Sequence, residues 1–181
     1  LPLETVKFGG ILTFCVAVYF VTIRLADRKS LWHKEMSAAM IYSFGIFAGP
    51  LSLSGDIPYS TIFLFVQFSI IVILNLFIFP IFEVESDRKD DMKSLAITVG
   101  VKRLKGVINF LFVLVFIFTA IGMLELPMLS RGNNWFLGQV IMLLMMGVLL
   151  SLMIWPSFFI KHNRYRLFGD GVFYFPLIML L

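Results

Sequence analysis

The feature that most constrains this chain is a series of long stretches that contain no charged residue. A helix crosses the apolar core of a bilayer with about 20 residues, in a range of about 17–25. Four of the six stretches reach that length. The first does so once Leu25 and Ala26, beyond Arg24, are counted, and the last is shorter and runs to the end of the chain. The stretches are residues 8–23, 36–55, 57–82, 106–124, 132–160 and 171–181.

Composition supports a chain that folds in lipid. Hydrophobic residues make up 60% of it and charged residues 14%, against about 25% charged in an ordinary soluble domain. Residues 61–82 show no alternation of apolar and polar positions, which a membrane β-strand requires. A single cysteine, Cys15, excludes an internal disulfide framework. The sequence therefore predicts an all-α, polytopic transmembrane helix bundle in which six helices are visible.

The basic residues predict how these helices are oriented. Three loops, at about residues 24–35, 83–105 and 157–170, hold four, six and three of the 15 Lys and Arg residues. The three loops share one face of the membrane if every predicted helix crosses it. Cytoplasmic loops carry the excess of Lys and Arg, so this face is expected to be cytoplasmic, in a bacterial cytoplasmic (inner) membrane. Membrane orientation accounts for the positive charge, and no nucleic-acid partner is expected.

The ends of the chain raise a separate expectation. The sequence opens with Leu1, and nothing before Phe8 has the pattern of a signal peptide. The last residues lie inside an apolar run. We expect residues 1–181 to form a single membrane domain that is a fragment lacking N-terminal helices. The alternative is a short natural protein inserted with its N-terminus outside.

The richest polar segment follows residues 57–82. Five of the 11 acidic residues lie there within nine positions, and they are Glu83, Glu85, Asp87, Asp90 and Asp91. If the helix continues past Phe82, Glu83 and Asp87 lie on one face, because residues four apart are neighbours on a helix.

The chemistry of this segment has two interpretations. Mg²⁺ is usually bound by one or two carboxylates together with substrate phosphates, and Arg88, Lys89 and Lys93 are placed to contact phosphate oxygens. One interpretation is therefore a Mg²⁺–diphosphate site at the cytoplasmic mouth of the bundle. The other is a solvated loop whose acids and bases neutralise one another. Residues 163–171 either cover this mouth or anchor at the interface.

The order of residues in the segment resembles the second aspartate-rich motif of the UbiA-type intramembrane prenyltransferases. That motif is D-x-x-x-D, then a short basic stretch, K-[ST]-L and a glycine. Here it appears as Glu83-Val-Glu-Ser-Asp87, Lys93-Ser94-Leu95 and Gly100. The resemblance implies that the six predicted helices correspond to helices four to nine of that fold. Glu83 replaces the first Asp of the motif, and the family's first motif, N-D-x-x-D-x-x-x-D, is absent from the chain.

The resemblance also implies roles for individual residues. Glu83 and Asp87, aided by Asp91, would hold Mg²⁺, while Arg28, Lys29 and Lys93 would contact the diphosphate of a prenyl diphosphate. The prenyl tail would lie in the apolar bundle, and a lipophilic acceptor would receive it. Asn75, two turns before Glu83, either lines this cavity or hydrogen-bonds a neighbouring helix.

Three classes of function are consistent with these features. The first is a membrane prenyltransferase that uses Mg²⁺. The second is a UbiA-like protein that has lost catalysis and binds or assembles partners, which the altered residues before Glu83 favour. The third is a small transporter, which is disfavoured because no ionisable residue lies in the middle of a predicted helix.

Overall fold

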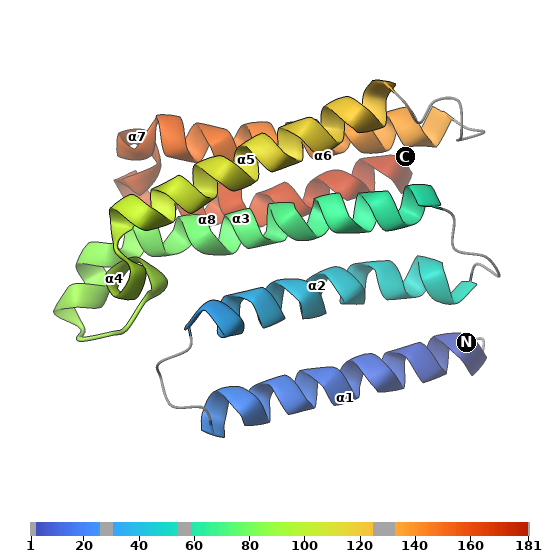
Figure 1. The fold of residues 1–181 in the computed structure, drawn as a ribbon, viewed down its shortest axis with the longest axis horizontal. Helices are drawn as coiled ribbons and strands as arrows, with labels where there is room; N and C mark the ends of the chain where they lie inside the picture. Colours follow the sequence, from blue (N-terminus) through green and yellow to red (C-terminus); the bar gives the residue numbers. More distant parts are fainter. Residues whose placement is uncertain (1–2, 26–30, 54–58, 125–132, 181) are drawn as a thin grey trace. The chain divides into compact units, whose positions relative to one another are not determined.

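The computed structural model describes residues 3–25, 31–53, 59–124 and 133–180, and these residues are helical apart from short turns (Figure 1). Their long helices are α1 (Leu3–Leu25), α2 (Leu31–Leu53), α3 (Tyr59–Lys89), α5 (Val101–Leu124) and α6 (Asn133–Ile154). No described residue is in a β-strand. The prediction of an all-α fold is confirmed. The chain divides into two compact units, Leu1–Ile73 and Leu74–Leu181.

Four helices in the described part of the chain are long and apolar enough to cross a membrane. They are α1 over Thr5–Thr22, α3, α5 and α6. The described apolar part of α2, Glu35–Ala48, is shorter than a span needs. Length and composition thus identify a helical membrane protein.

The first unit contains α1, α2 and the first half of α3. The helices α1 and α2 run antiparallel and side by side (Figure 1). Aromatic rings join α2 to α3. Phe44 and Phe47 have their ring centroids 4.8 Å and 5.4 Å from that of Phe65. Tyr42 stacks on Phe68 at 6.3 Å.

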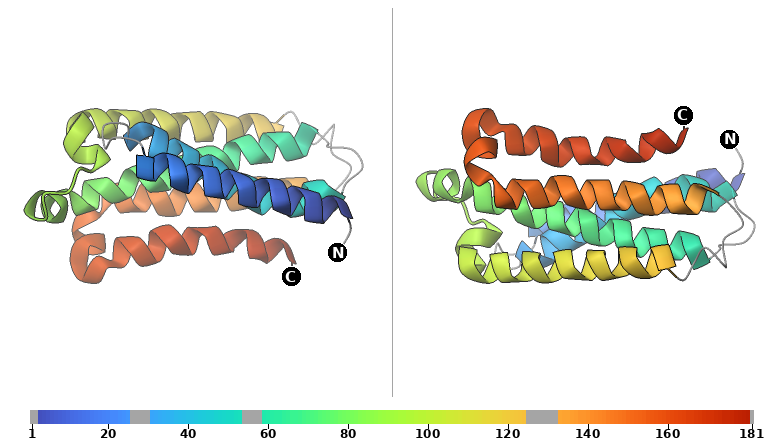
Figure 2. Two further views of the ribbon diagram at one scale, coloured as in Figure 1. Left: turned by 90° about the horizontal axis from the view of Figure 1, so that it is seen from below. Right: turned by 90° about the horizontal axis from the view of Figure 1, so that it is seen from above.

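The second unit contains the rest of α3 and all later elements. The helices α5 and α6 form an antiparallel pair, joined near their connection by a hydrogen bond from Trp135 Nε1 to the Gly122 carbonyl oxygen (2.9 Å). The 3₁₀ helix η3 (Val172–Leu180) runs back along α6, as Figure 2 shows. These elements place the ends of α3, α6 and α8 (Arg164–Gly171) at one end of the unit.

The structure differs from the predicted elements after residue 154. The helix expected over residues 132–160 ends at Ile154, and Pro156 begins the short helix α7 (Pro156–Ile160). The residue before a proline is driven out of the helical region, and Trp155 has non-helical angles. The predicted loop at 157–170 is itself helical, and the sixth stretch is the 3₁₀ helix η3.

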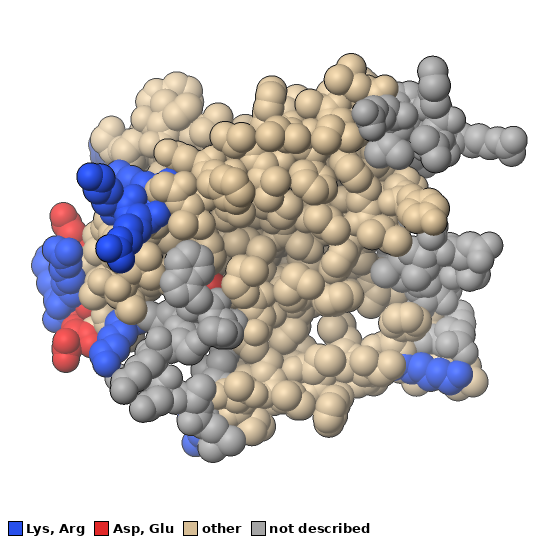
Figure 3. All heavy atoms as spheres, in the orientation of Figure 1, with Lys and Arg blue, Asp and Glu red and all other residues tan. Residues whose placement is uncertain are grey.

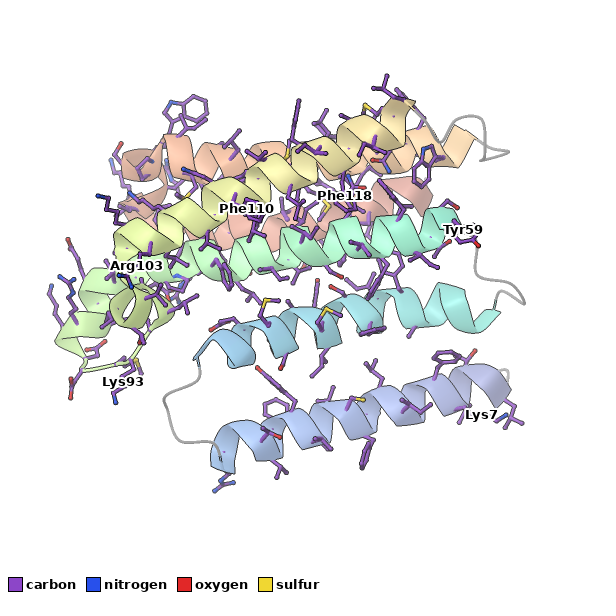
Figure 4. The ribbon with its side chains drawn as sticks, viewed as in Figure 1. Lys7, Tyr59, Lys93, Arg103, Phe110 and Phe118 are labelled. Carbon is purple, nitrogen blue, oxygen red and sulfur yellow. The ribbon has the colours of Figure 1, made fainter. Side chains whose placement is uncertain are left out.

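An apolar surface on α5 points away from the unit's core. Phe110 is 65% exposed, and Val113, Phe116 and Ile117 are exposed as well, whereas Ile108, Phe112 and Val115 are buried. Figure 4 labels Phe110 and Phe118 along this helix. A large exposed apolar surface marks contact with lipid or protein, and on a helix of spanning length it fits a lipid-facing side.

In the described part of the second unit, the basic side chains lie at one end. Its described Lys and Arg residues fall within residues 88–105 and 161–166, and Figure 3 shows the resulting cluster of basic and acidic side chains. Figure 4 places Lys93 and Arg103 at this same end. Two of the three segments predicted to be cytoplasmic are therefore together in space.

Candidate functional site at the end of α3

The helix α3 continues through the acidic segment to Lys89, with Pro80 inside it. The condition stated for the sequence, that the helix continues past Phe82, is met, so Glu83 and Asp87 are one turn apart on a continuous helix, and both are half-buried. Glu85, between them, is exposed.

Glu83 is held by two consecutive residues of α8. Arg166 donates to Glu83 Oε1 from Nη2 at 2.7 Å and from Nε at 3.1 Å. The Tyr165 hydroxyl donates to the same oxygen at 3.1 Å. All three hydrogen bonds share Oε1, so Oε2 accepts none from a described residue.

A sharp reversal of the chain brings α8 to this position. His162 and Asn163 have φ angles of 57° and 54°, in the left-handed region, and they turn the chain between α7 and α8. Tyr165 then packs its ring against two aromatic rings of α3. It lies parallel to Phe82 at 4.8 Å and edge-on to Phe79 at 5.8 Å. The buried ring fixes the backbone from which Arg166 extends.

The local environment favours the protonated forms of both donors. Burial is the main cause that raises the pKa of the Tyr165 hydroxyl, and the Glu83 carboxylate raises it further. The hydrogen bond to Glu83 raises the pKa of the Arg166 guanidinium, which therefore stays charged. Arg166 and Tyr165 thus remain hydrogen-bond donors across the physiological range of pH.

Asp87 offers a second carboxylate beside Glu83. Its side chain makes no hydrogen bond or ion pair with a described residue, although its carbonyl oxygen accepts from the Met92 amide at 2.8 Å. Mg²⁺ takes one or two carboxylates and completes its shell with water and phosphate oxygens. Oε2 of Glu83 and the carboxylate of Asp87 fit that donor set, since no described donor occupies them.

Asp91 is not joined to these two residues. It lies in the turn after α3 with a φ of 49°, and it is exposed. Within the described parts of the chain, no three His, Cys, Asp or Glu side chains form a group able to hold a metal. The predicted part of Asp91 in binding Mg²⁺ stays a prediction.

The remaining basic residues of the motif lie near the same end. Lys93 is exposed in the turn that leads through Ser94 into α4 (Leu95–Val99). Gly100 joins α4 to α5 with a φ of 91°, a conformation that costs glycine little and other residues more. The glycine of the K-[ST]-L…G pattern therefore has a conformational reason here. Arg28 and Lys29 lie outside the described residues.

Asn75 lies two turns below Glu83 and is only 3% exposed. Its Oδ1 has no hydrogen-bond partner. A Cβ at Gly169 would lie 2.8 Å from that oxygen and would also collide with the ring of Phe79. The residue thus faces α8, and the prediction that it lines a cavity is not tested.

Tyr165 and Arg166 were not predicted as site residues. The signal available in the sequence was the polar segment at residues 163–171, placed between two apolar stretches on the same side as the acidic motif. Its basic residues could be assigned to the mouth of the bundle, but not to Glu83, because the pairing depends on the turn at His162 and Asn163.

No protein-family model, curated protein or solved structure matches this chain. The fold and composition define a helical membrane protein, and any finer assignment depends on the residues at the end of α3.

Proposed function

We propose that this protein is a UbiA-type membrane prenyltransferase, which moves an isoprenoid group from a prenyl diphosphate to a lipophilic acceptor with the assistance of Mg²⁺. One observation carries the proposal. Glu83 and Asp87 lie one turn apart where a spanning helix ends, and the K-S-L…G pattern follows them. The charged end would face the cytoplasm of a bacterium.

The reaction class explains why carboxylates and basic residues are needed together. Breaking an allylic C–O bond leaves negative charge on the diphosphate, and stabilising developing charge is often the largest catalytic contribution. A bound Mg²⁺ supplies part of that stabilisation as a Lewis acid. Glu83 and Asp87 would supply its carboxylates, and Lys93, Arg28 and Lys29 would contact the diphosphate oxygens.

The apolar part of the unit suits the other half of the substrate. Apart from Asn75, the side chains of α3 directly below the acidic residues are apolar, and Ile78, Phe77 and Leu74 are buried. A water-excluding, apolar surrounding protects a reactive allylic cation from hydrolysis. It would also hold the prenyl tail.

Binding of a prenyl diphosphate tests this proposal. The full-length protein in detergent micelles would be titrated with geranylgeranyl diphosphate, with and without Mg²⁺, and with geranylgeraniol as the ligand that lacks the diphosphate. We expect binding of the diphosphate that requires Mg²⁺ and is abolished in Asp87→Ala. Equal binding of diphosphate and alcohol, or unchanged binding by Asp87→Ala, would refute the assigned site.

A second candidate function, that of a non-catalytic binding or assembly protein, is favoured by the Glu83–Arg166 ion pair. An arginine that permanently neutralises Glu83 would leave Asp87 as the principal carboxylate for a cation. The two candidates differ in turnover. An enzyme releases inorganic diphosphate from the prenyl diphosphate in the presence of membrane lipids that contain its acceptor, whereas an assembly protein releases none.

A further inference from the structure

We propose that Arg166 binds the diphosphate of the substrate, and that its ion pair with Glu83 is a resting position which it leaves when a divalent cation takes the carboxylate. The inference rests on the proposed function and extends it to an element, α8, outside the motif. Its basis is the way Arg166, Tyr165 and Glu83 share one oxygen atom.

The first argument is the distribution of the hydrogen bonds on Glu83. Tyr165 and both Arg166 nitrogens converge on Oε1. A cation that binds Oε2 and Asp87 would face the guanidinium across a single carboxylate. Two cations so close repel one another, and the interaction is strong at a half-buried site. The Arg166 side chain, which is longer and more exposed than that of Glu83, is the one that moves.

The second argument is that Arg166 can move while its backbone stays in place. Its side chain is 60% exposed, whereas that of Glu83 is 27% exposed. The neighbouring Tyr165 is buried against Phe82 and Phe79, and Gly169 is packed tightly against Phe79. The helix α8 is thus anchored to α3 on both sides of Arg166, and only the side chain is free to turn outward.

The third argument is the chemistry of the released group. A guanidinium presents several N–H donors in a planar fork that matches phosphate oxygens. Charge-assisted pairs of this kind are often bidentate and stronger than neutral hydrogen bonds. Since Arg166 reaches Glu83 in this state, it also reaches the oxygens of a phosphate bound to a cation on that carboxylate.

Arg164 provides a matched control. It lies two positions away on α8, and its guanidinium stacks over the ring of Phe158 with Cζ 4.6 Å from the ring centroid. The hydrogen bonds and the ion pair that Glu83 makes with described residues come from Tyr165 and Arg166, not from Arg164. Arg164→Gln removes the same charge from the same helix without touching the ion pair.

The test measures two affinities of the full-length protein in detergent micelles. One is the affinity for Mn²⁺ alone, used as a spectroscopic substitute for Mg²⁺. The other is the affinity for geranylgeranyl diphosphate at saturating Mg²⁺. For Arg166→Gln we expect tighter Mn²⁺ binding, because its competitor for Glu83 is gone. We expect about tenfold weaker binding of the prenyl diphosphate, the loss of roughly one charge-assisted contact.

Arg166→Lys keeps the charge and guards against a folding defect. We expect it to bind Mn²⁺ like the wild type and the prenyl diphosphate with an intermediate loss, because an ammonium lacks the planar fork. If Arg166→Gln changes both affinities no more than Arg164→Gln does, or weakens both, the proposal is overturned. A wild-type protein that binds no prenyl diphosphate would instead overturn the proposed function, and this inference with it.

Discussion

The ring of Tyr165 lies parallel to the ring of Phe82, with 4.8 Å between their centroids and an angle of 6° between their planes. This stack attaches α8 to the last turns of α3, and it places the Tyr165 hydroxyl 3.1 Å from Glu83. An apolar contact and a polar contact of one side chain therefore position the end of α8 at the acidic motif.

Two substitutions at Tyr165 separate these contacts. Tyr165→Phe keeps the stack and removes one hydrogen bond, so we expect it to lower the free energy of unfolding by about 1 kcal/mol. Tyr165→Leu also removes the aromatic pairing, and we expect a further loss of about 0.5–1.5 kcal/mol. Thermal unfolding in detergent micelles measures both, and equal losses would show that the stack contributes nothing.

The raised pKa of Tyr165 predicts how stability changes at high pH. The Tyr165 hydroxyl keeps its proton to a higher pH in the folded protein than in the unfolded chain, where the pKa of tyrosine is 10.0. Above that pH the folded state binds more protons than the unfolded state, so stability falls as pH rises. The contribution is complete below pH 10.0 and is lost as pH passes through the folded pKa.

The measurement is the unfolding temperature of wild type and Tyr165→Phe on both sides of this pH. Above pH 10.0, we expect the unfolding temperature of the wild type to fall more steeply with pH than that of Tyr165→Phe. The difference in tyrosinate absorbance between the wild type and Tyr165→Phe gives an independent measure of the pKa of Tyr165. Ionisation of Tyr165 at or below the ordinary tyrosine pKa would contradict the assignment.

The space around Gly169 and Gly171 predicts opposite effects on stability for a second pair of variants. A Cβ there would collide with Phe79 and lie 2.8 Å from Asn75 Oδ1, whereas a Cβ at Gly171 meets nothing within 4 Å. Gly169→Ala should lower the free energy of unfolding by about 1–3 kcal/mol, as overpacking typically does. Gly171→Ala should be neutral or stabilising, by up to about 1 kcal/mol. Similar unfolding temperatures for the two variants would rule out close packing of α8 on α3.

A matching pair lies on the other helices of the second unit. A Cβ at Gly122 of α5 would lie 2.7 Å from the Gln139 side chain of α6, and one at Gly147 meets nothing. We expect Gly122→Ala to destabilise the pairing of α5 and α6, and Gly147→Ala to leave it intact. The check is the same thermal unfolding assay. A stable Gly122→Ala protein would mean that Gln139 moves aside at little cost.

The charge-free stretches of the sequence were enough to predict the helical membrane fold. Residues 83–105 were expected to form a loop, and the continuation of α3 to Lys89 was considered only as a condition. Long charge-free stretches have few alternatives to a spanning helix, because a backbone in lipid must satisfy its own hydrogen bonds. The predictions were weakest beyond Ile154. There the fold depends on the local angles of Trp155, His162 and Asn163, and no apolar pattern encodes them.

The candidate site was likewise predicted only in part from the sequence. The spacing of Glu83 and Asp87 follows from helix geometry, and the structure agrees with it. The partners of Glu83 are Tyr165 and Arg166, which follow it by 82 and 83 positions in the sequence. A single sequence gives no indication of a contact between residues so far apart. Asp91 lies beyond the helix, in the left-handed turn after Lys89, and its part in binding Mg²⁺ stays a prediction.

The most direct test of the central claim is a Mg²⁺ titration of geranylgeranyl diphosphate binding in two charge-neutralising variants of α3. Asp87→Asn removes a carboxylate from the proposed site, and Glu85→Gln removes one from an exposed position two residues away. We predict that Asp87→Asn loses the Mg²⁺-dependent part of the affinity and that Glu85→Gln keeps it. Equal Mg²⁺ dependence in both variants would contradict a diphosphate site built on Glu83 and Asp87.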